Sequence, residues 1–117
     1  MLDDKTRYRL LKLLQESPEL SQRQIAEVLG VSVGKTNHCL RALLDKGLLK
    51  VRNFRDNNNK LAYAYYLTPK GAHEKVRATA GFLKRKLEEY QGLEREIEEL
   101  KREVHAIDRE ADGLHRP

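Results

Sequence analysis

The side chains best suited to bind another molecule lie between Ser32 and Arg41, where polar and cationic residues recur at helical spacing. This set comprises Ser32, Gly34, Lys35, Asn37, His38 and Arg41. Residues three and four apart share one face of a helix. On such a face an asparagine amide can pair with adenine and an arginine with guanine, while a glycine lets the helix approach the base edges. A solvated helix face would show similar residues, so this pattern alone leaves both interpretations open.

Two short helices joined by a tight turn are expected to position that face. Ser21 and Gln24 form the S-x-x-Q pattern of a capping box, which predicts the start of a helix. Gly30 suits the left-handed residue at its end, and Ser32 is expected to cap the second helix. The predicted inward residues are Ile25, Ala26, Val28 and Leu29 on the first helix and Thr36, Leu40, Leu43 and Leu44 on the second. The stretch from Ser21 to Gly47 is therefore predicted to be a helix-turn-helix.

The segments on either side are expected to complete a small core. Upstream, RYRLLKLLQE predicts a helix capped by Asp3 or Asp4 and ended by Ser17 and Pro18. Downstream, LLKVRNF and LAYAYYL predict a β-hairpin around the polar turn RDNNNK. The hairpin residues expected to cover the helices are Leu49, Val51, Leu61, Tyr63, Tyr65 and Leu67. The predicted fold is mainly α with a small β-hairpin, a winged helix-turn-helix followed by a long C-terminal coiled-coil helix.

The hairpin tip carries a second group of candidate contact residues. These are Arg52, Arg55, Asn57, Asn58 and Lys60. As an ordinary surface turn the tip would favour asparagine, which tolerates positive φ. If the neighbouring helix contacts bases in DNA, the cations and amides of the tip would bind phosphates or enter a minor groove. We favour this second interpretation.

The charge distribution supports a polyanionic partner for the N-terminal part. Residues 1–68 contain 12 Lys and Arg against 7 Asp and Glu, whereas residues 69–117 contain 11 of each, so the net charge of +5 arises in the first part. A basic half beside a balanced half indicates that one binds a polyanion and the other has a structural task.

The motifs AEVLGVS, LLDKGLL and YLTPKG lie between Ile25 and Gly71. With them, the chain resembles the MarR family of bacterial transcriptional regulators, and more narrowly the exopolysaccharide-associated MarR-type branch. The resemblance implies a winged helix, dimer formation and operator binding in transcriptional control.

The C-terminal part is expected to form one long helix and to mediate dimerisation. Thr68 and Pro69 form an N-cap followed by proline at the first helical position. The predicted seam residues alternate by three and four with one irregular step beside Gly92, and comprise Leu83, Leu87, Tyr90, Leu93, Ile97, Leu100, Val104 and Ile107. We therefore expect a winged-helix domain at 1–68, a dimerisation helix at 69–113 and a disordered tail at 114–117. Pairing with itself is the simplest interpretation, while a different coiled-coil partner stays open.

The sequence argues against several other kinds of chemistry. His38 is adjacent to Cys39, but the other three histidines are scattered along the chain, so no metal site is expected, and a single cysteine allows no intramolecular disulfide. GVSVGKT lacks the spacing of a phosphate-binding loop, and no catalytic set or cofactor motif stands out. The N-terminus has acidic residues and no long apolar run, which predicts a cytoplasmic protein without a membrane span.

Three classes of function remain. The charge distribution and the wing favour a sequence-specific regulator that binds double-stranded DNA and is not an enzyme. The alternatives are a coiled-coil adaptor whose winged helix binds protein and an RNA-binding factor. The sequence does not indicate a small-molecule effector.

Overall fold

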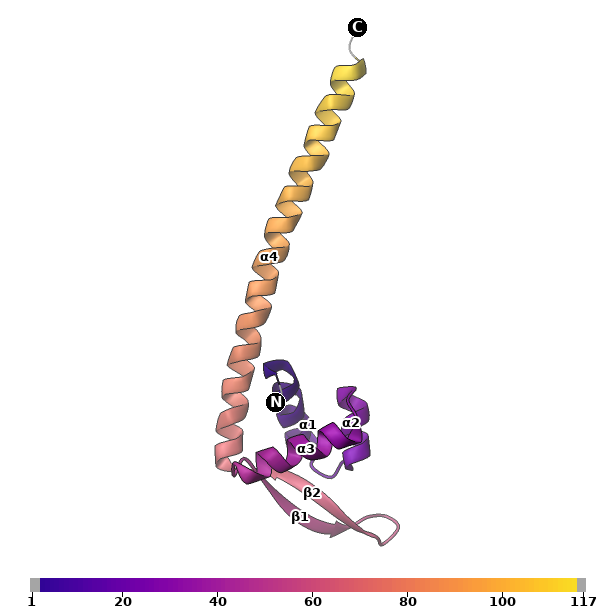
Figure 1. The fold of residues 1–117 in the computed structure, drawn as a ribbon, viewed down its shortest axis with the longest axis vertical. Coiled ribbons are helices and arrows are strands. Elements are labelled where there is room, and N and C mark those ends of the chain that lie inside the picture. Colours follow the sequence, from indigo (N-terminus) through magenta and orange to yellow (C-terminus); the bar gives the residue numbers. More distant parts are fainter. Residues whose placement is uncertain (1–2, 116–117) are drawn as a thin grey trace. The chain divides into compact units, whose positions relative to one another are not determined.

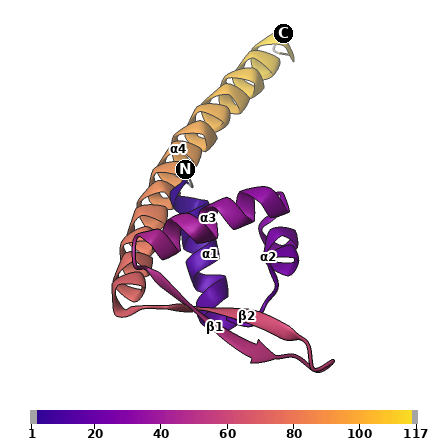
Figure 2. The same ribbon diagram turned by 60° about the horizontal axis from the view of Figure 1, so that its bottom comes forward.

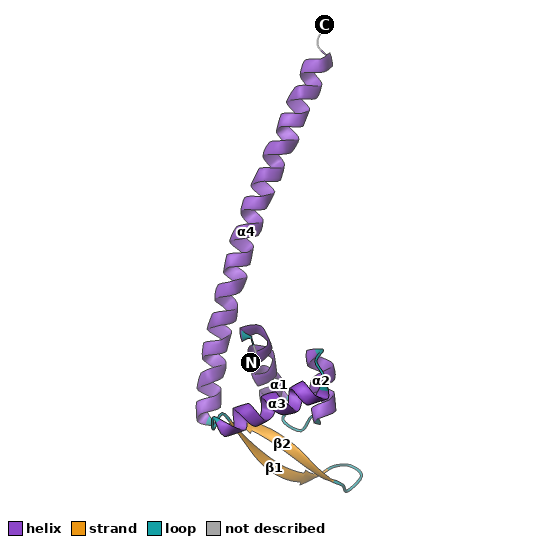
Figure 3. Ribbon diagram, in the orientation of Figure 1, coloured by secondary structure: helices purple, strands orange, loops and turns teal. Residues whose placement is uncertain are grey.

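The computed structural model describes residues 3–115, with side chains through residue 113. The elements follow in the order α1 (Asp4–Glu16), α2 (Gln22–Leu29), α3 (Val33–Asp45), β1 (Leu49–Arg55), β2 (Leu61–Leu67) and α4 (Pro69–His115) (Figures 1 and 3). The predicted fold class is confirmed: a mainly helical chain with one antiparallel hairpin and a long C-terminal helix. The chain divides into two compact units, Met1–Phe82 and Leu83–Pro117.

The boundaries of the first two helices are set by local capping. The Asp3 carboxylate accepts a hydrogen bond from the backbone N–H of Thr6 at 2.7 Å, which starts α1. The predicted capping box is present, because Ser21 Oγ accepts from Gln24 N at 3.1 Å and Gln24 Oε1 accepts from Ser21 N at 2.9 Å. Gly30 ends α2 in the left-handed conformation, with φ of 70°. These contacts satisfy backbone groups that a helix end would otherwise leave unpaired.

One core joins α1, α2, α3 and the base of the hairpin. Its buried members are Leu10, Leu11, Leu14, Ile25, Leu29, Cys39, Leu40, Leu43, Leu48, Leu49 and Tyr65. The inward position predicted for Val28 is wrong, because its side chain is 51% exposed. Ile25, Ala26 and Leu29 already fill the narrow face that an eight-residue helix turns inward, and Val28 lies beyond the edge of that face.

The hairpin covers the helices only at its base. Its register pairs Leu49 with Leu67 at the base and Arg55 with Leu61 at the far end. The predicted burial of Val51, Leu61 and Tyr63 is wrong, because they are 39%, 57% and 54% exposed. Strands of about 20 Å or more reach past the helices, so the distal half of the hairpin projects as a wing (Figure 2).

The junction between the hairpin and α4 depends on Thr68 and Gly71. As predicted, Thr68 caps the helix: its Oγ1 accepts from Gly71 N at 3.0 Å, and it also donates to the Gly47 carbonyl at 2.6 Å. Gly71 is buried against the backbone of Leu48, and a Cβ added to it would lie 1.9 Å from the Leu48 carbonyl oxygen. The glycine is therefore required by the close approach of two backbones.

We expect Gly71→Ala to lower the free energy of unfolding by about 2 kcal/mol or more, since the backbone must shift to admit the methyl group. Gly92→Ala is the matched control in the same helix, because only the end of the Arg95 side chain lies near, at 4.0 Å. That control should raise helix stability by about 0.5 to 1 kcal/mol. Thermal and urea denaturation would measure both changes, and equal stability of the two variants would contradict the close approach.

The first turns of α4 belong to the same compact unit as the winged helix. Ala78 is 4% exposed, the rings of Tyr8 and Phe82 stack at a centroid distance of 5.1 Å, and Arg7 forms an ion pair with Glu74 at 3.2 Å. The helix begins at Pro69, directly after the predicted boundary, but the compact unit extends to Phe82.

The second unit is the remainder of α4. The helix is continuous through Gly92 and reaches His115, two residues into the predicted disordered tail, while residues 116 and 117 lie outside the described part. The eight predicted seam residues in this unit are 43% to 62% exposed, which is high for large apolar side chains. Their use in a coiled coil remains a prediction.

Candidate nucleic-acid interface

The orientation of α3 is fixed by its cap and by one buried threonine. Ser32 Oγ accepts from Lys35 N at 3.0 Å, and the Ser32 carbonyl accepts from Thr36 Oγ1 at 3.0 Å. Thr36 is 1% exposed, and Leu40 and Leu43 follow it into the core. The opposite face of α3 is consequently turned to solvent.

That outward face brings together most of the residues predicted for it. Gly34, Lys35, His38 and Arg41 are all exposed. Asn37 is only half-buried and lies at the edge toward α2, where its Nδ2 donates to Gln22 Oε1 at 3.1 Å. The face therefore offers a flat glycine surface, two cations, an imidazole and one oriented amide.

The wing tip is shaped by a side chain that the sequence analysis overlooked. Asp56 Oδ1 accepts from the backbone N–H groups of Asn58 and Lys60, both at 2.9 Å. Asn59 takes the left-handed conformation, with φ of 57°. An aspartate at the start of a turn is a recognisable signal for this arrangement. Asp56 thus holds the backbone of the tip and leaves the neighbouring side chains to face outward.

The five predicted wing residues, Arg52, Arg55, Asn57, Asn58 and Lys60, are all exposed. Two of the cations have intramolecular contacts that limit their motion. Arg55 Nη1 donates to the Asn59 carbonyl at 3.2 Å, and the Arg52 guanidinium lies 5.8 Å from the centre of the Tyr66 ring. Both contacts leave the positive charge without a compensating carboxylate.

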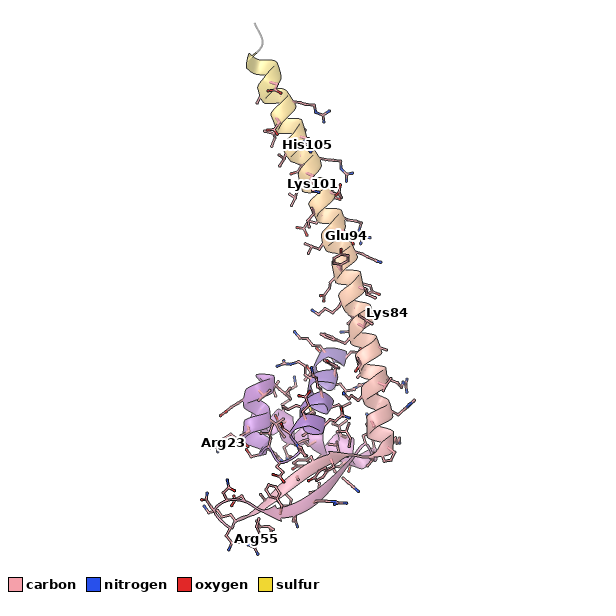
Figure 4. The ribbon with its side chains drawn as sticks, turned by 180° about the vertical axis from the view of Figure 1, so that it is seen from behind. Arg23, Arg55, Lys84, Glu94, Lys101 and His105 are labelled. Atoms are coloured by element: carbon pink, nitrogen blue, oxygen red, sulfur yellow. The ribbon has the colours of Figure 1, made fainter. Side chains whose placement is uncertain are left out.

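A sixth exposed cation, Arg23 on α2, was not predicted as a contact residue. Figure 4 shows Arg23 and Arg55 on the same side of the first unit. Across the described side chains, ion pairs involve other residues, and none of the six site cations takes part in one: Arg23, Lys35, Arg41, Arg52, Arg55 and Lys60. Arg23 lies two residues after the N-cap Ser21, so the sequence already indicated a cation at the start of α2.

No group of three or more His, Cys, Asp or Glu side chains in residues 3–113 is arranged to hold a metal ion. Cys39 is buried in the core, on a different side of α3 from the exposed His38. None of the helices in the described part of the chain is both long and apolar enough to cross a bilayer.

Comparison with known proteins matches this geometry to a DNA-binding fold. The family model described as winged helix-turn-helix DNA-binding matches residues 3–50. A search of curated proteins gives no significant match.

Several solved structures share the fold. The MarR family protein Rv2887 of Mycobacterium tuberculosis, solved with p-aminosalicylic acid, is 28% identical, with a TM-score of 0.50 over 64% of this chain and 55% of its own. The transcriptional regulator SlyA is 24% identical, with a TM-score of 0.60 over 90% of this chain and 73% of its own. A variant of ZitR from Lactococcus lactis is 25% identical, with a TM-score of 0.57 over 90% of this chain and 73% of its own.

These matches confirm the predicted similarity to MarR-type winged-helix regulators. The chain spans only 55% of the length of Rv2887 and 57% of the length of the PcaV transcriptional regulator from Streptomyces coelicolor, another solved structure that it matches. The exopolysaccharide-associated branch is not tested by any of them and stays a prediction.

Proposed function

We propose that this chain, whose first unit has the winged helix-turn-helix fold shared with MarR-family regulators, is a transcriptional regulator that binds double-stranded DNA in a sequence-specific manner. The observation that carries the proposal is the set of six exposed cations without ion pairs on α2, α3 and the wing. Exposed cations outside ion pairs can provide the sequence-independent part of DNA affinity, because they release counterions from phosphates.

In this proposal α3 enters the major groove and supplies the base contacts. Arg41 and Asn37 carry the groups that pair with guanine and adenine, and the bare backbone at Gly34 permits close approach. Ser32 and Lys35 at the start of α3 lie where a helix N-terminus attracts phosphate. The exposed wing residues bind neighbouring phosphates or the adjacent minor groove.

The second unit supports a dimer in which two copies of the chain pair along the seam. An isolated helix of 33 residues would expose its apolar stripe over about 50 Å, at about 1.5 Å per residue. A second copy with the same stripe covers that surface and presents two reading helices to a two-fold operator. Control of exopolysaccharide genes is supported by the resemblance alone.

An electrophoretic shift assay on duplex DNA from the promoter region of its own gene tests the proposal, with RNA of the same sequence and an unrelated duplex as controls. We expect a retarded complex on the promoter duplex at concentrations that leave the other two free. Equal binding to all three would contradict sequence specificity, and absence of binding to all three would favour the adaptor interpretation.

Single substitutions separate base reading from phosphate binding. Arg41→Ala should cost about 1 to 3 kcal/mol on the best site and relax base preference at one position, because it removes a base contact. Lys60→Ala is the matched control, since it removes one exposed cation from the wing and should weaken all sequences to a similar extent. Competition binding against a panel of single-base variants measures both effects, and an unchanged preference for Arg41→Ala would place base reading elsewhere.

A further inference from the structure

We propose that Gln22 and Tyr65 are positioning residues that hold the Asn37 amide in one orientation and thereby set the base preference at one operator position. The inference rests on the proposed function, because it concerns the outward face of α3, which we call the reading face. Two hydrogen bonds link these three side chains, and we call them the relay: Asn37 Nδ2 donates to Gln22 Oε1 at 3.1 Å, and Gln22 Nε2 donates to Tyr65 Oη at 3.0 Å. The relay connects α3, α2 and β2.

The Tyr65 end of the relay is a fixed point. Its side chain is 7% exposed and belongs to the core. Its backbone N–H donates to the Pro18 carbonyl at 2.9 Å, and its strand position is paired with Val51. A hydroxyl anchored in this way can hold a more mobile partner in place.

Gln22 needs that anchor because packing alone does not fix its side chain. It is half-buried and lines a cavity of about 290 Å³ together with Tyr65, Phe54 and Ala62. An open cavity on one side removes close contacts that would otherwise select a single side-chain conformation. The two hydrogen bonds therefore hold the Gln22 amide in place between Tyr65 and Asn37.

The direction of the relay determines what Asn37 offers to a base. One Nδ2 hydrogen is used by Gln22, which leaves the other hydrogen and the Oδ1 oxygen free. A donor beside an acceptor matches the N7 and N6 groups of adenine in the major groove. Without the bond to Tyr65, the Gln22 amide could move away, and Asn37 would lose the partner that holds its donor and acceptor in this arrangement.

Tyr65→Phe is the sharpest test, because it removes one hydroxyl and keeps the ring in the core. Tyr63→Phe is the matched control: this tyrosine lines the same cavity and is 54% exposed, but Gln22 bonds to Tyr65. Base preference is measured with the full chain against duplexes that carry every single-base change. Asn37→Ala first identifies the operator position that Asn37 reads.

We expect the wild-type protein to prefer one base at that position by about tenfold to a hundredfold. Tyr65→Phe should reduce this preference by about fivefold or more at that position alone, while Tyr63→Phe leaves it unchanged. Gln22→Ala should relax the same position, and adding Tyr65→Phe to it should cause no further loss, because the relay is already broken. Circular dichroism melting of each variant checks that the fold is kept.

Three results would overturn the inference. They are an unchanged preference in Tyr65→Phe, a uniform loss of affinity for all sequences, and equal effects of Tyr65→Phe and Tyr63→Phe. Absence of duplex binding by the wild-type protein would instead refute the proposed function, so the two failures are distinguishable.

Discussion

Raising the salt concentration from 50 to 200 mM should lower the affinity for operator DNA by about a thousandfold or more. Among the described residues of each chain, at least six exposed cations on α2, α3 and the hairpin take part in no ion pair, so a dimer can neutralise at least six phosphates. Six neutralised phosphates correspond to a loss of about 10³ in affinity over this range. Fluorescence anisotropy with a labelled duplex at a series of salt concentrations measures the slope directly.

The wing supplies the internal control for this slope. Arg55→Ala with Lys60→Ala removes two of the six cations from a segment whose distal half projects beyond the core. The salt slope should fall by about 1 for each phosphate that the variant no longer neutralises. Binding that is indifferent to salt, or a slope unaffected by the double variant, would contradict phosphate binding by these residues.

Leu100→Lys should convert a dimer into a monomer at low protein concentration and weaken operator binding by about a hundredfold. Leu100 lies within the seam and is 52% exposed in the single chain, so pairing would bury it and the substitution would bury a charge. Separating the two reading units removes the gain in avidity that comes from a second, intramolecular binding event. Light scattering should show a mass that falls toward 13.6 kDa.

The matched control is Ala106→Lys, which adds the same charge to the same helix at a position outside the predicted seam. It should leave the mass unchanged. If the helix merely attracted DNA through its cations, both variants would bind more tightly. A Leu100→Lys protein that stays dimeric and binds normally would refute the seam and indicate that the dimer forms through the winged helix.

Helix and turn boundaries were predictable because the signals that determine them are local. Ser21 with Gln24, Gly30, and Thr68 before Pro69 each act within about four residues, so a linear pattern contains the information. The alternation of Leu61, Tyr63 and Tyr65 predicted a strand correctly but not its burial. Periodicity shows that residues share a face, whereas burial depends on how far the covering helices extend.

The interactions within the candidate site were less predictable. The reading face could be inferred from spacing, but the relay joins Gln22 to Asn37 and Tyr65, which are 15 and 43 residues away in the chain. Whether such polar groups meet depends on the packing of α2 against α3 and the wing. In the same way, the seam shows its period in the sequence, while the identity of its partner requires a second molecule.

The projection of the wing beyond the core affects how this protein can change during evolution. Val51, Leu61 and Tyr63 are exposed, so substitutions in the distal half of the hairpin remove little packing. Arg55 and Lys60 can therefore be replaced without a large loss of stability, and if they contact DNA as proposed, such replacements would change its affinity. Asn37 has no such freedom, because the partners that orient it belong to the structured body of the domain. Under the proposed function, selection could adjust overall affinity through the wing with few side effects, whereas a new base preference at Asn37 would require coordinated changes in α2 and β2.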